Sequence, residues 1–236
     1  MKSRRIFIIV FLFIISVAPA KAQIFKGMAI FGGNFSQIDG DQVVGYYKFG
    51  LNTGVGVMAP LNAKRNWLAS MEILYNRIGS KESRDPFQYI ANLHYASIPL
   101  LIHYEDKKGG WTFGAGLQYS RLFKVSEDWG LPSDTIKYMD RPVLETVKDF
   151  NRNDISAILD LRFKIVDKLK FNFRYQYSLI PIRQGVTYFN GFRSGDYEYS
   201  SWKRNFYNNV LTFRLIYMIN ERSSSELDKN IRRNEY

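Results

Sequence analysis

The sequence predicts an all-β protein, an eight-stranded antiparallel up-and-down transmembrane β-barrel. Three observations lead to this prediction: long segments in which apolar and polar residues alternate, connections that are alternately long and short, and a secretory N-terminus. A strand that crosses a membrane within a barrel needs about 9–11 residues, with one face toward lipid and the other toward a polar interior.

The alternation is cleanest in residues 171–179, FNFRYQYSL, where apolar or aromatic residues occupy the odd positions and polar residues the even ones. Period two indicates a strand with two unlike faces, which a soluble sheet with one wet face would also produce. Length separates the two cases, because the candidate strands have about 10–13 residues whereas soluble strands have about 5–6. The eight candidates are Phe25–Phe35, Phe49–Ala59, Trp67–Arg77, Leu93–Tyr104, Trp111–Phe123, Asp154–Ile165, Leu169–Leu179 and Asn208–Ile219.

The connections between these candidates alternate regularly in length. Three are short: Pro60–Asn66, Glu105–Gly110 and Val166–Lys168. Four are long: Ser36–Lys48, Ile78–Asn92, Lys124–Asn153 and Ile180–Tyr207. Antiparallel neighbours joined in this order have every long connection on one side, which predicts four long outer loops and three short periplasmic turns.

The N-terminus has the features of a signal peptide, predicted to span residues 1–22. Basic residues precede the apolar run Ile6–Val17, which is too short for a membrane-spanning helix, and Ala20-Lys21-Ala22 fits a cleavage site. Cleavage would remove four basic residues and lower the net charge from +11 to +7. We therefore expect a barrel over residues 23–220, a charged periplasmic tail over 221–236, and a location in the outer membrane. Without cysteine, the chain has neither a disulfide framework nor a lipidated cysteine.

The inward positions of the predicted strands carry a polar network. Eight strands leave an interior that side chains alone can fill, and a buried charge without a partner is costly. We therefore predict a hydrogen-bonded plug and not a conducting pore, in a non-enzymatic protein with a structural or interaction role in the envelope. The predicted network consists of Glu72, Gln118, Asp160, Arg162, Arg174, Gln176 and Arg214.

Catalysis and metal binding are not expected. His94 and His103 are nine residues apart on one strand, so they lie on opposite faces, with His103 inward and His94 near the outer rim. Ser97 does not share a face with His94, although a partner on a neighbouring strand stays possible. Asp39-Gly40-Asp41 could offer oxygens to Ca²⁺, but the same residues form ordinary turns, so we predict no metal and no cofactor.

The last long loop is rich in aromatic and basic residues. They could form a contact surface for a ligand or a protein, or equally an upper aromatic girdle whose arginines contact lipopolysaccharide phosphate. The expected partners are outer-membrane lipid and lipopolysaccharide, with periplasmic or outer-membrane proteins as further candidates and no nucleic acid. The candidate contact surface consists of Tyr188, Phe189, Phe192, Arg193, Tyr197, Tyr199 and Trp202.

Several segments resemble the PorT-like outer-membrane β-barrel family, whose members carry an outer membrane protein beta-barrel domain. The segments are GMAIFGGNFSQIDGD, GYYKFGLNTGVGV, SMEILYNRIGS with Glu72 inward, LHYASIPLLIHY, LKFNFRYQYSL and NNVLTFRLIYMI. The resemblance implies an eight-stranded outer-membrane barrel. Because the founding member is associated with type IX secretion, it also offers an alternative function, that of an accessory component of a type IX-like secretion apparatus.

Overall fold

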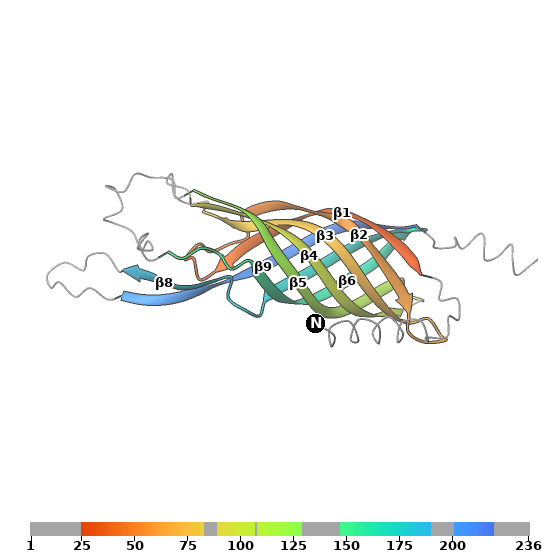
Figure 1. Cartoon of the computed structure of the whole chain (residues 1–236). Coiled ribbons are helices and arrows are strands. Elements are labelled where there is room, and N and C mark those ends of the chain that lie inside the picture. Colours follow the sequence, from red (N-terminus) through yellow and green to blue (C-terminus); the bar gives the residue numbers. More distant parts are fainter. Residues whose placement is uncertain (1–24, 83–88, 107, 129–146, 190–200, 220–236) are drawn as a thin grey trace, which may run out of the picture.

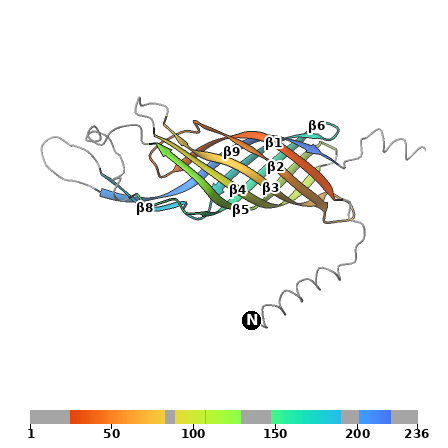
Figure 2. The same ribbon diagram turned by 45° about the horizontal axis from the view of Figure 1, so that its top comes forward.

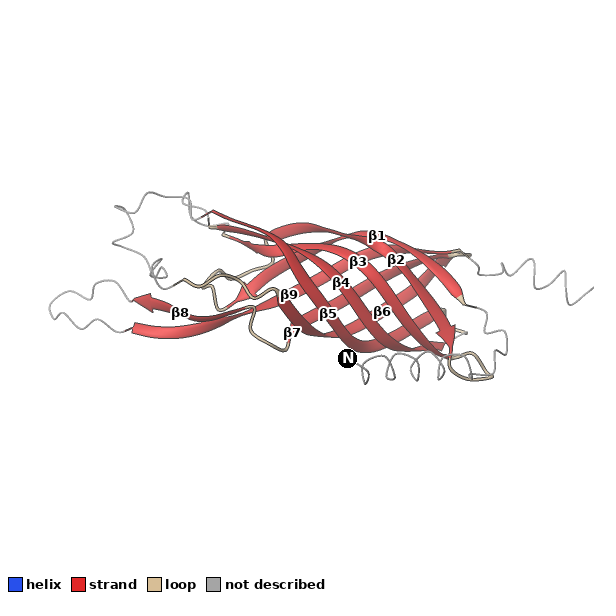
Figure 3. Cartoon of the chain, in the orientation of Figure 1, coloured by secondary structure: helices blue, strands red, loops and turns tan. Residues whose placement is uncertain are grey.

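The structure is a computed structural model, and it describes residues 25–82, 89–106, 108–128, 147–189 and 201–219. The predicted signal peptide and the predicted tail lie outside these residues. The described segments form strands and loops, and the strands wrap around a common axis (Figures 1 and 3). Among the described residues, no helix long and apolar enough to cross a membrane is found.

Eight of the nine strands close into a barrel, as the sequence predicts. The sheet order is β1-β2-β3-β4-β5-β6-β7-β9-β8, all neighbours are antiparallel, and β1 also pairs with β9. This last pairing closes the ring, and β8 extends the sheet beyond it by pairing with β9. The strands are β1 (Lys26–Asp39), β2 (Lys48–Pro60), β3 (Trp67–Lys81), β4 (Ile90–Asp106), β5 (Trp111–Asp128), β6 (Asn153–Val166), β7 (Leu169–Ser178), β8 (Arg183–Phe189) and β9 (Ser201–Met218).

The strands end close to the predicted positions at the short turns but run further on the outer side. The last predicted loop, Ile180–Tyr207, was assigned wrongly, because it contains β8 and the first part of β9. These segments pair with each other, Arg183 opposite Phe206, and project beyond the barrel as a ribbon (Figure 2). The physical reason is apolar packing, since Val186 and Phe206 are buried in a cluster at the outer end.

Aromatic side chains form a girdle at the periplasmic end of the outward face. Trp67 packs edge-on against Tyr104 with ring centroids 5.4 Å apart. Phe163 lies between Trp111 and Phe171, at centroid distances of 5.3 and 5.0 Å. Rings at this position are typical of the interface between a membrane and water.

The interior is arranged in layers along the barrel axis. An apolar floor, which begins near the periplasmic turns and reaches mid-strand at Leu74, consists of Met28, Ile30, Met58, Leu68, Leu74, Ile216 and Met218. Polar and charged side chains follow in the middle. An apolar outer cap consists of Ile38, Val43, Ile78, Tyr89, Ala91, Leu93, Tyr95, Leu122, Phe150, Ile182, Val186, Phe206 and Val210. The polar network therefore lies between two apolar layers, which the alternation alone did not predict.

Candidate functional site

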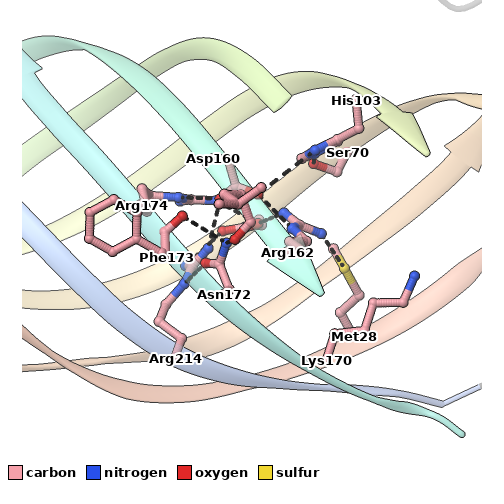
Figure 4. Close-up of polar contacts among 12 residues, drawn as sticks. Met28, Ser70, His103, Asp160, Arg162, Lys170, Asn172, Phe173, Arg174 and Arg214 are labelled. Carbon is pink, nitrogen blue, oxygen red and sulfur yellow. Dashed lines mark hydrogen bonds and ion pairs between the residues drawn. The ribbon is translucent and has the colours of Figure 1, made fainter. Parts of the chain in front are cut away.

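The middle of the interior is organised around Glu72 on β3, whose carboxylate accepts hydrogen bonds from three arginines. Figure 4 labels these arginines, Arg162, Arg174 and Arg214, beside Asp160. Arg162 on β6 and Arg174 on β7 donate to Oε1 at 2.9 Å each. Arg214 on β9 donates to Oε2 at 3.1 Å. One carboxylate therefore links β3 to three strands, β6, β7 and β9, none of which is a neighbour of β3 in the sheet.

Asp160 on β6 is the second carboxylate of this ion cluster. It accepts from Arg162 Nε at 2.6 Å and from Arg174 Nε at 2.8 Å, and Arg214 Nη2 lies 3.5 Å from its Oδ2. The register explains the contact, because Asp160 and Arg174 are directly opposite across β6 and β7. All five side chains are buried, so the hydrogen bonds offset a large desolvation cost.

The structure brings five of the seven predicted network residues into this cluster and leaves the other two, Gln118 and Gln176, outside it. Gln118 donates to Ser120 at 2.9 Å, and Gln176 donates to Ser156 at 3.1 Å. Both glutamines are buried and face inward, as the alternation indicates, but they do not contact the carboxylates through any hydrogen bond described here.

Sequence reasoning missed a second buried carboxylate group around Asp154 on β6. Its Oδ2 accepts from Ser156 and Ser178 at 3.0 Å each and from Asn208 at 3.1 Å. Alternation places Asp154 inward, but nothing in the sequence shows that β7 and β9 supply its donors. The register of the strands provides that information.

The interior also contains a Ser-His-Asp arrangement around His103, which the sequence analysis did not predict, whereas the neighbouring-strand partner of His94 is the hydroxyl of Tyr75. Ser70 Oγ lies 2.7 Å from His103 Nε2, and His103 Nδ1 lies 3.8 Å from Asp160 Oδ1. The second distance exceeds that of a hydrogen bond, and the same Asp160 oxygen is bonded to Arg162. All three residues are buried, which leaves no room for a substrate beside the serine. We interpret the group as a structural hydrogen-bonded contact.

Gly114 on β5 provides the space that His103 needs. The two residues are directly opposite on β4 and β5. A Cβ at position 114 would collide with the imidazole ring, and its distance to Cε1 would be 2.6 Å. A glycine inside a strand often marks such a close approach.

The outer mouth of the barrel is filled by apolar side chains around Arg183. Its guanidinium forms two hydrogen bonds of 2.8 Å with Glu127 and lies 3.6 Å above the centre of the Phe150 ring. Tyr89 donates to the same carboxylate at 2.7 Å. Charge pairing and cation–π contact thus hold the segments around Phe150 and Arg183 over the interior.

The predicted contact surface of the last loop falls mostly outside the described residues. Phe192, Arg193, Tyr197 and Tyr199 lie outside them, as do the side chains of Tyr188 and Phe189. Trp202 is described, and it packs against the apolar outer cap. Its ring therefore contributes to the closure of the outer mouth of the barrel.

The two aspartates at the start of the first outer loop accept hydrogen bonds from protein groups, one of them on β9. Asp39 accepts from Gln37 at 2.7 Å and from Asn209 at 3.1 Å, whereas Asp41 accepts from the backbone N–H of Val43 at 2.8 Å. These bonds fit a turn, and Gly40 between the aspartates has a φ of 107°. Among the described residues, no group of three acidic, histidine or cysteine side chains could hold a metal ion.

Burial makes this loop sensitive to pH. It raises the pKa of Asp41 from its ordinary value of 3.8 to about 7. Because the folded loop holds a proton that the unfolded loop loses near pH 4, the loop's stability falls as pH rises through 7. We expect hydrogen-exchange protection of residues 40–47, corrected for intrinsic rates, to fall about tenfold from about pH 6 to about pH 8.

The variant Asp41→Asn should keep the bond to Val43 and lose this pH dependence. Asp39→Asn is the matched control and should leave the pH dependence in place. Protection that is equal at the two pH values in the unmodified protein would contradict the assignment to Asp41.

Comparison with known proteins identifies a family. Residues 25–184 match the family described as "Outer membrane protein beta-barrel domain". A comparison with curated proteins finds no match.

Several solved structures are similar to this chain. The neisserial surface protein A structure is 11% identical, with a TM-score of 0.47, and the match covers 83% of this chain and 97% of that one. Ail of Yersinia pestis is 11% identical, with a TM-score of 0.39 and coverages of 82% and 99%. OprG of Pseudomonas aeruginosa is 11% identical, with a TM-score of 0.34 and coverages of 83% and 94%. At this level of similarity, no function transfers to this chain.

The family match covers more than half of the chain, and it agrees with the closed ring of eight antiparallel strands. The chain therefore belongs to the outer-membrane β-barrel domain family, whose place is the outer membrane.

Proposed function

We propose that this protein is a closed, non-conducting, non-enzymatic barrel that acts in the outer membrane as a structural and interaction scaffold for its outer loops. The observation that carries the proposal is the side-chain filling of the interior in three successive layers. The narrow interior of an eight-stranded barrel supports it, because such a barrel has space for side chains and little else.

The ion cluster argues against a pore on energetic grounds. An ion that passed Glu72 would have to separate this carboxylate from three arginines, all of them buried. Breaking a single buried ion pair typically costs about 3–5 kcal/mol. The apolar floor and the outer cap add two further barriers on either side, because their apolar side chains cannot replace an ion's hydration shell.

Conductance across a planar lipid bilayer tests the proposal. We expect no stepwise current after insertion of the full-length protein, with insertion verified by a heat-dependent gel shift of protein recovered from vesicles. A large water-filled porin serves as the positive control. Steady current steps whose frequency increases with the amount of inserted protein would overturn the closed-barrel proposal.

The PorT-like resemblance and the accessory role in type IX-like secretion stay predictions within this proposal. They are distinguished from a general scaffold by deletion of the gene in its host. A block in the export of cargo proteins would favour the secretion role, whereas unchanged export would favour the scaffold.

A further inference from the structure

A row of basic side chains lies on the outward face of β3, β4 and β5. Arg77 is directly opposite His94, and His94 is directly opposite Lys124, so the three residues occupy one level of the sheet. Arg121 lies on the same face, one pair closer to the membrane centre, opposite Ala96. Lys124 and Arg121 are exposed, and the other two are half-buried.

Local geometry aims this row outward. The pairing of β4 with β5 is shifted between His94 and Tyr95, so that Phe123 becomes an extra residue and both Phe123 and Lys124 are exposed. Arg77 donates to Asn92 at 3.0 Å through Nη2, but its buried Nε has no hydrogen-bond partner among the described residues.

An aromatic cluster stands beside the charges. The rings of Tyr75, His94 and Phe123 lie about one ring-width apart, with centroid distances of 6.0 to 6.2 Å, and the Tyr75 hydroxyl lies 2.7 Å from His94 Nδ1. Such rings combine an apolar body with a polar edge and suit the boundary between acyl chains and headgroups.

The position along the strands places the row at the outer membrane boundary. The periplasmic girdle residues Trp67 and Tyr104 are ten residues from Arg77 and His94 along β3 and β4. Ten residues of a strand span about 33 Å, which at a tilt of about 40° corresponds to the apolar band of about 25 Å. The outward positions between these levels are mostly large and apolar, among them Met71, Ile73, Ile98, Leu100 and Ile102.

From these observations we infer a binding site for the phosphate headgroup of lipid A, formed by Arg77, Lys124 and Arg121 around His94. At this level an outer-leaflet lipopolysaccharide molecule has its phosphates directly above its acyl chains. No acidic side chain occupies the outward face of β3–β5 between the girdle and this row, and Asp128 lies four residues beyond Lys124. Guanidinium and ammonium groups are the usual protein ligands of phosphate.

Binding of defined lipids to the full-length protein in detergent tests this site by native mass spectrometry. We expect the unmodified protein to bind diphosphorylated lipid A at least tenfold more tightly than lipid A with the same acyl chains and no phosphate. Phosphatidylglycerol and inorganic phosphate should bind at least tenfold more weakly than diphosphorylated lipid A. Equal binding of any of these three competitors would overturn the assignment, and this comparison needs no variant.

The double variant Arg77→Gln/Lys124→Gln should lose at least tenfold in affinity for diphosphorylated lipid A. The matched control is Lys64→Gln/Lys108→Gln, which removes the same charge from two periplasmic turns and should bind as the unmodified protein does. Equal affinities of the double variant and the control would overturn the inference. Because the site lies on the outward face, this result is independent of whether the barrel conducts ions.

Discussion

Replacement of Glu72 by glutamine should destabilise the barrel by about 3–5 kcal/mol, the largest effect that we expect from a single polar substitution. The side chain keeps its size, but three buried guanidinium groups then share one carboxylate, Asp160. Unfolding by urea in lipid vesicles, followed by tryptophan fluorescence, measures the free energy, and the heat-dependent gel shift reports whether the barrel closes.

The matched control is Glu105→Gln, a loss of the same group at the periplasmic rim. Glu105 bonds Lys170 at 2.7 Å, and its side chain is 16% exposed, so water can replace part of the interaction. We expect a smaller loss there than for Glu72→Gln, because one ion pair is broken instead of three.

A second substitution tests whether the effect comes from the uncompensated charge. Arg214→Met in the Glu72→Gln background removes one of the three guanidinium groups. The double variant should therefore lose less free energy of unfolding than the sum of the losses in the two single variants. An unchanged urea midpoint for Glu72→Gln, or strictly additive effects in the double variant, would contradict the role of Glu72 as the centre of the cluster.

The fold was predictable from the sequence because alternation and strand length both reflect local constraints of a membrane-spanning strand. In β7 every outward residue is apolar or aromatic, so the alternation along the strand is enough to predict that Arg174 faces inward. The same reasoning was weak for β1, where Met28 and Ile30 face inward while Ala29 and Phe31 face outward. Because apolar residues occupy both faces there, the sequence shows no alternation. The apolar floor could not be predicted from the sequence for the same reason.

Pairing between distant strands could not be predicted from one sequence. The alternation along each strand places Ser70, His103 and Asp160 inside the barrel. Only the register between strands shows that the serine hydroxyl lies 2.7 Å from the imidazole. The donors of Asp154 depend on register in the same way. Outer strand ends were missed because pairing continues above the membrane, where lipid no longer imposes an apolar outward face, as Lys203 and Arg204 on β9 illustrate.

Replacement of Phe206 by alanine should open the outer cap, with a local loss of about 3–5 kcal/mol. Phe206 on β9 is fully buried, its backbone carbonyl accepts the N–H of Ile182 at 2.8 Å, and Arg183 lies 5.7 Å from its ring centre. A cavity at this point removes apolar contacts from the segment that closes the mouth. Hydrogen exchange of residues 179–186 measures the change, and we expect a loss of protection of at least a hundredfold.

Phe213→Ala is the matched control, because it deletes the same side chain from the same strand on the lipid-facing side, where Phe213 is 39% exposed. It should lower global stability through lost apolar burial but leave exchange in residues 179–186 unchanged. If both variants lowered protection there equally, the cap would unfold only with the whole barrel. If neither did, Phe206 would not support the cap. A selective effect of Phe206→Ala means that the outer mouth is an independently stable layer, held by its own apolar core above the ion cluster.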